Sequence, residues 1–244
     1  MTFVILDLTR LEEKRQRLAG ENEPVSWLAR QEQQNFERLT SGKRRREWFG
    51  GRMAAKWAGA DLLARFGEPL PWSGLVVLPD EYGRPGLAAG LKTRLLPDVS
   101  ISHSGNLAGA LAVSPGLCGM DIQEVTERVV KVRDRFCTPA EETVIRSCFS
   151  FGNERQPIGL TALWAAKEAL RKVAATPALP GFLDLVLTGI NGDDAGSELA
   201  SWRFDFRWEH GAAEGILAAP LCSVAVCHGA GYVLALTARK RTPL

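Results

Sequence analysis

Three residues in the second half of the chain have the types and spacing of a reactive helix face. Trp164, Glu168 and Lys172 follow one another in four-residue steps within the segment WAAKEALRK. A helix would therefore place a carboxylate and an ammonium group on the same side. The simpler alternative is an exposed Glu-to-Lys pair worth a few tenths of a kcal/mol, and this segment taken alone favours that alternative.

A second candidate is an acidic residue inside an apolar segment. Asp121 lies in CGMDIQE, which otherwise has the composition of a strand, and an unpaired charge is costly to bury there. A metal ion would remove that cost, and the carboxylates of Asp121 and Glu168 are the hard oxygen ligands that Mg²⁺ prefers. In the alternative interpretation, Asp121 simply faces water at a strand end.

A small polar segment, SISHSGN at residues 100–106, holds one of only three histidines. The hydroxyl of Ser102, the imidazole of His103 and the backbone N–H groups are all able to bind phosphate. A polar hairpin with a solvated histidine is the more common explanation for such a segment.

Basic residues gather in the first half of the chain. Within the basic run Lys43–Arg46, Arg44 to Arg46 are expected to form a solvated helix face, as charge runs usually do. Arg52 follows two glycines, and Arg84 lies in the stiff Gly-Arg-Pro turn. These two arginines are better placed to bind a polyanion.

The elements that must position these residues follow from periodicity. Apolar residues at helical spacing predict a long helix over 41–66, opening at Ser41, in which Gly50-Gly51 bends the helix or admits a close neighbour. Two more helices are predicted at 139–149 and 160–174. Strands are predicted at 74–78, 98–102, 107–113, 117–125, 182–187, 202–208, 221–227 and 232–236, and surface loops at 153–156 and 189–197.

The order of these elements predicts an α+β protein built from two similar halves, residues 1–116 and 117–244. In each half a helix is followed by strands. Trp202, Phe204, Phe206 and Trp208 alternate strictly, which turns one aromatic face of their strand toward a core. Sequence identity between the halves is too low to define a repeat.

Composition excludes several classes of protein. Thirty basic and 28 acidic residues give a formal charge of +2, so no global field attracts nucleic acid or an anionic membrane. No window approaches the roughly 18 apolar residues of a membrane span, and the N-terminus lacks the order of a signal peptide. Five scattered cysteines suggest neither disulfides nor a zinc site, so we expect a cytoplasmic protein.

Five short motifs in this order resemble the 4′-phosphopantetheinyl transferase superfamily. They are Gly-Arg-Pro, Ser-Ile-Ser-His-Ser-Gly, Gly-Met-Asp, Phe-Cys-Thr-x-x-Glu-Glu and Trp-x-x-Lys-Glu-Ala-x-x-Lys, over residues 83–172. The chain length and two-half organisation look like the larger, surfactin-synthetase-activating type. The resemblance implies two halves in a pseudo-twofold relation, each a long helix on a small, mainly antiparallel sheet.

The resemblance also implies an activity: Mg²⁺-dependent transfer of phosphopantetheine from coenzyme A to a serine of an apo acyl or peptidyl carrier protein, releasing adenosine 3′,5′-bisphosphate. Fatty-acid, polyketide and nonribosomal-peptide carriers all offer such a serine, and the sequence does not choose among them. We expect a monomer that binds neither nucleic acid nor membrane. A basic-helix RNA-binding protein is disfavoured by the near-neutral charge and the lack of an aromatic RNP-like motif.

Site residues carry over from the resemblance position by position. Asp121 and Glu168 are implied as metal ligands, and Glu168, Lys172 and Asp121 as the catalytic group. The residues implied to bind coenzyme A are Arg52, Arg84, Ser102, His103 and Lys167.

One position departs from the family pattern. Many members have a second acid where this chain has Gln123, and Glu124 cannot replace it because the next strand residue points to the opposite face. We therefore expect two protein carboxylates plus water on the metal, with Gln123 able to hydrogen-bond such a water. A non-catalytic coenzyme- or nucleotide-binding module with a degenerate metal site is the rival hypothesis.

Overall fold

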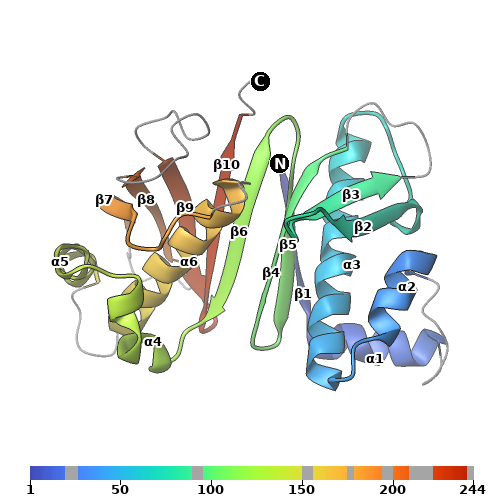
Figure 1. Ribbon diagram of the computed structural model, residues 1–244, viewed down its shortest axis with the longest axis horizontal. Coiled ribbons are helices and arrows are strands. Elements are labelled where there is room, and N and C mark those ends of the chain that lie inside the picture. Colours follow the sequence, from blue (N-terminus) through green and yellow to red (C-terminus); the bar gives the residue numbers. More distant parts are fainter. Residues whose placement is uncertain are drawn as a thin grey trace. The chain divides into compact units, whose positions relative to one another are not determined.

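The computed structural model describes residues 1–19, 27–89, 96–149, 156–174, 179–193, 200–208 and 222–240 (Figure 1). The contacts divide the chain into two compact units, of which the first is essentially Met1–Cys118 and the second Gly119–Ala238. Both units consist of helices and a five-stranded sheet, as the α+β prediction requires. We describe each unit by itself.

Unit 1 is a sheet with the strand order β1-β5-β4-β3-β2, in which every neighbouring pair is antiparallel. The long helix α3 contacts β1, β5, β4 and β2. The elements in chain order are β1 (Thr2–Asp7), α1 (Leu8–Ala19), α2 (Arg30–Glu37), α3 (Gly42–Arg65), β2 (Leu75–Pro79), β3 (Pro85–Ala89), β4 (Asp98–Ser104) and β5 (Leu107–Val113).

Helix α3 begins where the sequence predicted. Ser41 is its N-cap, and its hydroxyl accepts a hydrogen bond from the backbone N–H of Arg44. The helix runs unbroken through Gly50 and Gly51. A Cβ on Gly50 would lie 2.2 Å from a methyl of Leu8, and one on Gly51 would lie 2.7 Å from Ile101. The two glycines therefore allow close approach of α3 to its neighbours.

Unit 2 repeats this order of elements, with the strand order β6-β10-β9-β8-β7. The pairs β7–β8, β8–β9 and β9–β10 are antiparallel. In Figure 1, α6 lies along one face of this sheet, as α3 does in unit 1. The elements are β6 (Leu117–Glu124), α4 (Arg128–Lys131), α5 (Pro139–Cys148), α6 (Gln156–Ala174), β7 (Leu185–Asp193), β8 (Ala200–Trp208), β9 (Cys222–Gly229) and β10 (Tyr232–Arg239).

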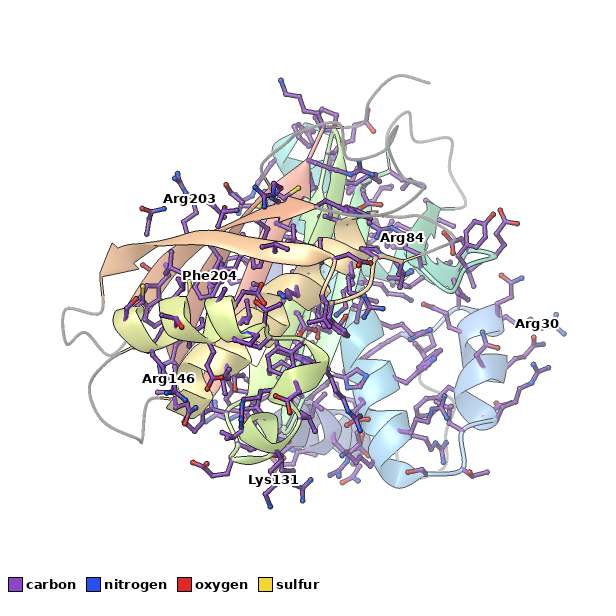
Figure 2. The ribbon with its side chains drawn as sticks, turned by 60° about the vertical axis from the view of Figure 1, so that its left-hand side comes forward. Arg30, Arg84, Lys131, Arg146, Arg203 and Phe204 are labelled. Carbon is purple, nitrogen blue, oxygen red and sulfur yellow. The ribbon has the colours of Figure 1, made fainter. Side chains whose placement is uncertain are left out.

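The aromatic alternation on β8 forms part of the core of unit 2. Trp202, Phe204 and Phe206 are buried, and the rings of Trp202 and Phe204 contact Phe149 at the end of α5. The intervening Arg203 is mostly exposed, and Figure 2 shows it on the side of the strand opposite to Phe204. The period-two pattern therefore identified the buried face correctly.

Several elements differ from the prediction. Residues 189–193, predicted as part of a loop, belong to β7, because Gly189–Asp193 continue the pairing with β8 after a register shift at Leu187. Strands β1 and β3 and helices α1, α2 and α4 were not predicted. Gln156, predicted as part of a loop, is the first residue of α6. Residues 153–155 and 194–197, predicted as loops, lie outside the described residues.

None of the described helices is long and apolar enough to cross a membrane.

Candidate functional site

Asp121 is the centre of a polar cluster in unit 2. It is 3% exposed and lies within β6, so the alternative of a water-facing strand end is wrong. Its Oδ1 lies 2.8 Å from Nζ of Lys172, and its Oδ2 accepts a 2.9 Å hydrogen bond from the amide of Gln123. The same ammonium donates to the carbonyl of Met120 at 2.9 Å. Both carboxylate oxygens therefore have the partners that burial of a charge requires.

A glycine brings the strand and helix of this cluster together. A Cβ on Gly119 would lie 1.9 Å from the backbone oxygen of Ala169, so the backbone of β6 rests directly on α6. This close approach places Asp121, two residues further along β6, against Lys172 on α6. Asp121 and Gln123 share one face of β6, as residues two apart on a strand must.

Glu168, one helical turn before Lys172, is held by its own helix. Its Oε1 lies 3.3 Å from Nη1 of Arg171, and the side chain is 23% exposed. Burial raises the pKa of Glu168, and the negative charge of Asp121 raises it further, against the lowering effects of Arg171 and Lys172. Arg171 in turn stacks on the ring of Phe182, with its guanidinium carbon 4.3 Å from the ring centroid, and donates to the carbonyl of Pro180.

The two carboxylates fit a hard divalent cation. The like charge of Asp121 contributes to the raised pKa of Glu168, and a cation bound to both would relieve this repulsion. In the described residues no group of three or more His, Cys, Asp or Glu side chains gathers as a ligand set. Two carboxylates are nevertheless a usual protein contribution to a Mg²⁺ site, which completes its octahedron with water and phosphate oxygens.

Lys167, implied by the resemblance to lie near phosphate, is fully buried instead. Its ammonium lies 2.8 Å from Glu141 and donates to the carbonyl of Phe136 at 2.7 Å. Burial lowers the pKa of Lys167, and the bond to Glu141 acts in the opposite direction. In this arrangement the ammonium faces the protein interior, so a phosphate contact would require breaking a buried ion pair.

Unit 1 contains a basic cavity of about 620 Å³ beside the first half of α3. It combines three positive side chains from α3 with His103 from β4 and with the turn between β2 and β3. The residues that line it are Ser41, Lys43, Arg44, Glu47, Trp48, Gly51, Arg52, Pro79, Gly83, Pro85, Ile101 and His103.

Arg52 lies in this cavity with unused hydrogen-bonding capacity. Its guanidinium stacks on Trp48, 3.4 Å from the ring centroid, and Nη1 donates to the carbonyl of Trp48. Nε has no hydrogen-bond partner among the described residues. Burial lowers the pKa of Arg52 to about 10, partly offset by Glu32. A bound anion would compensate the positive charge of this guanidinium, whose burial disfavours the charged form.

The other predicted residues of unit 1 have separate locations. His103 lines the cavity, and its Nδ1 lies 3.8 Å from Glu47. Ser102 is 6% exposed and, as the preceding residue of β4, points to the opposite face. Arg84, labelled in Figure 2, is not among the residues that line the cavity, although its neighbours Gly83 and Pro85 are. Its guanidinium is bound to Asp98 and donates to the carbonyl of Cys118.

Three groups at these sites were missed from the sequence. Arg44 was expected on a solvated face and is exposed, but it also lines the cavity, in which Arg44, Trp48 and Arg52 follow at four-residue steps. That spacing was available in the sequence. Lys43, which is also exposed, lines the same cavity. Arg171, the partner of Glu168, was also missed, because its contact depends on Phe182 and Pro180.

A family model and several known proteins match part of the chain. A family model described as the 4′-phosphopantetheinyl transferase superfamily matches residues 117–236. A holo-[acyl-carrier-protein] synthase from Halalkalibacterium halodurans is 41% identical over 91 residues, which are 35% of this chain and 71% of that protein. The corresponding protein from Exiguobacterium sibiricum is 34% identical over 106 residues, covering 43% and 81%.

Among solved structures, a holo-(acyl-carrier-protein) synthase from Bacillus anthracis in complex with CoA (3′,5′-ADP) shares 26% identity, with a TM-score of 0.36, over 46% of this chain and 95% of that one. The sequence matches to the two synthases cover 71% and 81% of those relatives, and the residues matched by the family model include Asp121 and Glu168. They confirm the membership that the five motifs indicated: the chain belongs to the 4′-phosphopantetheinyl transferase superfamily.

Proposed function

We propose that the protein transfers the 4′-phosphopantetheine arm of coenzyme A to a serine of an apo acyl or peptidyl carrier protein and releases adenosine 3′,5′-bisphosphate. The observation that carries this proposal is the cluster of Asp121, Glu168 and Lys172, which lies inside the region matched by the family model. Two relatives of the chain are named holo-[acyl-carrier-protein] synthases.

Asp121 and Glu168 are the residues we propose as Mg²⁺ ligands, since their oxygens are hard and their mutual repulsion favours a cation. When bound there, Mg²⁺ would neutralise negative charge on the coenzyme A pyrophosphate. Gln123, which stands where many members of the family have a second acidic residue, supports the site. Its amide donates to Asp121 and so holds this carboxylate in one orientation.

Glu168 is the proposed general base. The serine oxygen forms a bond to phosphorus while the bond from phosphorus to the adenosine bisphosphate oxygen breaks, and Glu168 accepts the serine proton. Burial and Asp121 raise the pKa of Glu168 in the metal-free protein, and a bound cation would offset the contribution of Asp121. Lys172, on the same helix face, compensates the negative charge of the departing phosphate.

The basic cavity of unit 1 is the proposed binding site for the nucleotide phosphates. Arg52 offers a partly buried guanidinium whose Nε has no hydrogen-bond partner in the described part of the chain, and His103, Lys43 and Arg44 line the same space. Arg84 and Ser102 remain candidates through the family resemblance, and Arg84 must then act from its bond to Asp98.

We assign the chain to the larger, surfactin-synthetase-activating type within the superfamily. The synthases match less than half of this chain, and unit 1 adds a second unit with the same order of strands. Action as a monomer in the cytoplasm belongs to the same proposal and stays a prediction.

The test is transfer itself. The protein is incubated with coenzyme A, Mg²⁺ and a panel of apo fatty-acid, polyketide and nonribosomal-peptide carriers, and each carrier is weighed by mass spectrometry. We expect at least one carrier to gain the mass of the phosphopantetheine arm, and the pattern identifies the carrier class. No gain on any carrier, together with coenzyme A binding that calorimetry finds unchanged by EDTA, would instead establish the non-catalytic binding module.

A further inference from the structure

The buried pair of Glu141 and Lys167 connects three segments of unit 2 at one point. Lys167 on α6 binds Oε1 of Glu141 at 2.8 Å and the carbonyl of Phe136 at 2.7 Å. The same Oε1 accepts the N–H of Leu187 on β7 at 2.9 Å, and Oε2 accepts the N–H of Thr138 at 2.8 Å. We call this arrangement the Glu141–Lys167 brace. It attaches α6 to β7 and to the start of α5.

Unit 1 contains the same brace. Lys56 on α3 binds Glu32 at 2.6 Å and the carbonyl of Trp27 at 2.9 Å, and Glu32 accepts the N–H groups of Val77 on β2 and Ala29. In both units the glutamate is the third residue of a capped helix, and the carbonyl comes from the residue five positions earlier. Lys56, Lys167 and both glutamates are at most 1% exposed.

The repetition shows which role the brace has in both units. Unit 1 has Trp57 after its buried lysine, where unit 2 has Glu168. The same arrangement occurs in both units although the neighbouring residues differ, so it is a structural feature of each unit. The buried lysine therefore has a role without any phosphate ligand. Both ammonium groups are already compensated by a carboxylate and a carbonyl.

In unit 2 the brace fixes the helix that carries the reactive residues. Lys167 and Glu168 are adjacent on α6, so their side chains leave the helix about 100° apart, one into the core and one toward Asp121. Phe136, whose carbonyl receives Lys167, also contacts Trp164 edge-on at 5.0 Å between ring centroids. On its other side α6 meets β6 at Gly119, where a Cβ would reach 1.9 Å from Ala169 O. Sliding or turning of α6 is therefore opposed from both sides.

We propose that Glu141 and Lys167 are positioning residues for the transfer reaction: their brace sets the position of α6 and thereby holds Glu168 and Lys172 at Asp121. This inference rests on the proposed function and replaces the direct phosphate role for Lys167. Misplacement of a catalytic group by about 1 Å lowers a rate by about 100-fold, so loosening of the brace affects turnover before it affects binding of coenzyme A.

The test compares two matched double variants of the full chain, Glu141→Gln/Lys167→Met in unit 2 and Glu32→Gln/Lys56→Met in unit 1. Each removes both buried charges, so neither is left uncompensated. The melting temperature of each variant is measured first. We then measure kcat, KM for coenzyme A and, by calorimetry, Mg²⁺ affinity at the same number of degrees below the melting temperature of each variant. We expect both variants to lose a similar amount of melting temperature relative to the wild type. Only the unit 2 variant should lose about tenfold or more in kcat, and its KM for coenzyme A should stay within about twofold of the wild-type value. Mg²⁺ binding weakens only in that variant.

Glu141→Asp gives a milder change if the double variant of unit 2 does not fold. It keeps both buried charges but shortens by one methylene the side chain that joins Lys167 to the N–H groups of Leu187 and Thr138. A folded Glu141→Asp protein with a reduced kcat and an unchanged KM for coenzyme A supports the proposal. An unchanged kcat overturns it.

Equal effects of the two double variants on kcat, or no effect of either, overturn the positioning role. A raised KM for coenzyme A with unchanged kcat also overturns it, because that result makes Lys167 a phosphate ligand. A wild-type protein that transfers nothing refutes the proposed function instead, so the two failures are distinct.

Discussion

Lys172 pairs with Asp121, 51 positions earlier in the chain, at 2.8 Å. Helical spacing had suggested Glu168 as the partner of Lys172 in an exposed pair, but Glu168 is held by Arg171 and Lys172 extends from α6 to β6. The lysine therefore compensates a carboxylate that is 3% exposed. This contact joins two of the three segments that carry the family motifs of unit 2.

Lys172→Met should destabilise the protein by about 2 kcal/mol, because Asp121 keeps its burial and loses a charged hydrogen-bond donor. Urea unfolding measures the change. Asp121→Asn added to Lys172→Met should restore part of this stability while leaving the protein inactive. If the single variant is as stable as the wild type, the pair contributes little to the fold.

Glu168→Gln should lower kcat by about 100-fold or more, since an amide cannot accept the serine proton. The fold should persist, because Gln can still accept from Arg171. Glu142→Gln is the matched control: its side chain is 20% exposed against 23% for Glu168, and it also pairs with an arginine, Arg146. Transfer by the control should be unchanged. Near-normal transfer by Glu168→Gln would remove Glu168 from the mechanism.

Gln123→Glu should bind Mg²⁺ about tenfold more tightly, because it adds a hard carboxylate on the face of β6 that carries Asp121. Without Mg²⁺ the variant should be less stable, since Gln123 now donates to Asp121 and a glutamate would repel it. Calorimetry measures the affinity. Glu124→Gln, on the opposite face, should not change it, and an equal response of both variants would count against Gln123 as a neighbour of the metal.

The carboxyl of Glu168 should titrate above its ordinary pKa of 4.5 in the metal-free protein, chiefly through burial and secondly through Asp121. Because its pKa is higher in the folded chain than in the unfolded chain, Glu168 stays protonated to a higher pH in the folded state. The free energy of unfolding therefore falls as pH rises from the unfolded-state pKa of Glu168 through its folded-state pKa. Carbon-13 NMR of the carboxyl group reports the titration. Asp121→Asn should move the pKa of Glu168 part of the way down, and an upward movement would contradict this account.

Arg52→Gln should raise KM for coenzyme A by about tenfold with little change in kcat, as expected for loss of a ground-state phosphate contact. Arg45→Gln is the control, because Arg45 lies on the same helix and also stacks on an aromatic ring, that of Phe36, but does not line the cavity. Equal KM values for the two variants would show that the cavity does not bind the nucleotide phosphates.

Much of the local structure could be predicted from the sequence, because periodicity depends on near neighbours. The start of α3 at Ser41, the helices α5 and α6, and the buried face of β8 all followed from local patterns. Strand β3 did not, since its residues Pro85–Ala89 have no alternating pattern and pair with both β2 and β4. Pairing between distant strands supplies the stabilisation that local sequence lacks.

The sequence by itself determined the family, through five motifs in order, and determined that Trp164, Glu168 and Lys172 share a helix face. Only the tertiary structure decided what each side chain meets. It turned Lys167 inward to Glu141, paired Lys172 with Asp121, and brought Arg44 and Arg52 to one cavity with His103. The physical reason is that the helix and strand periods determine which residues of one element share a face. The partner of each side chain comes from another segment, and the local sequence does not encode which segment packs there.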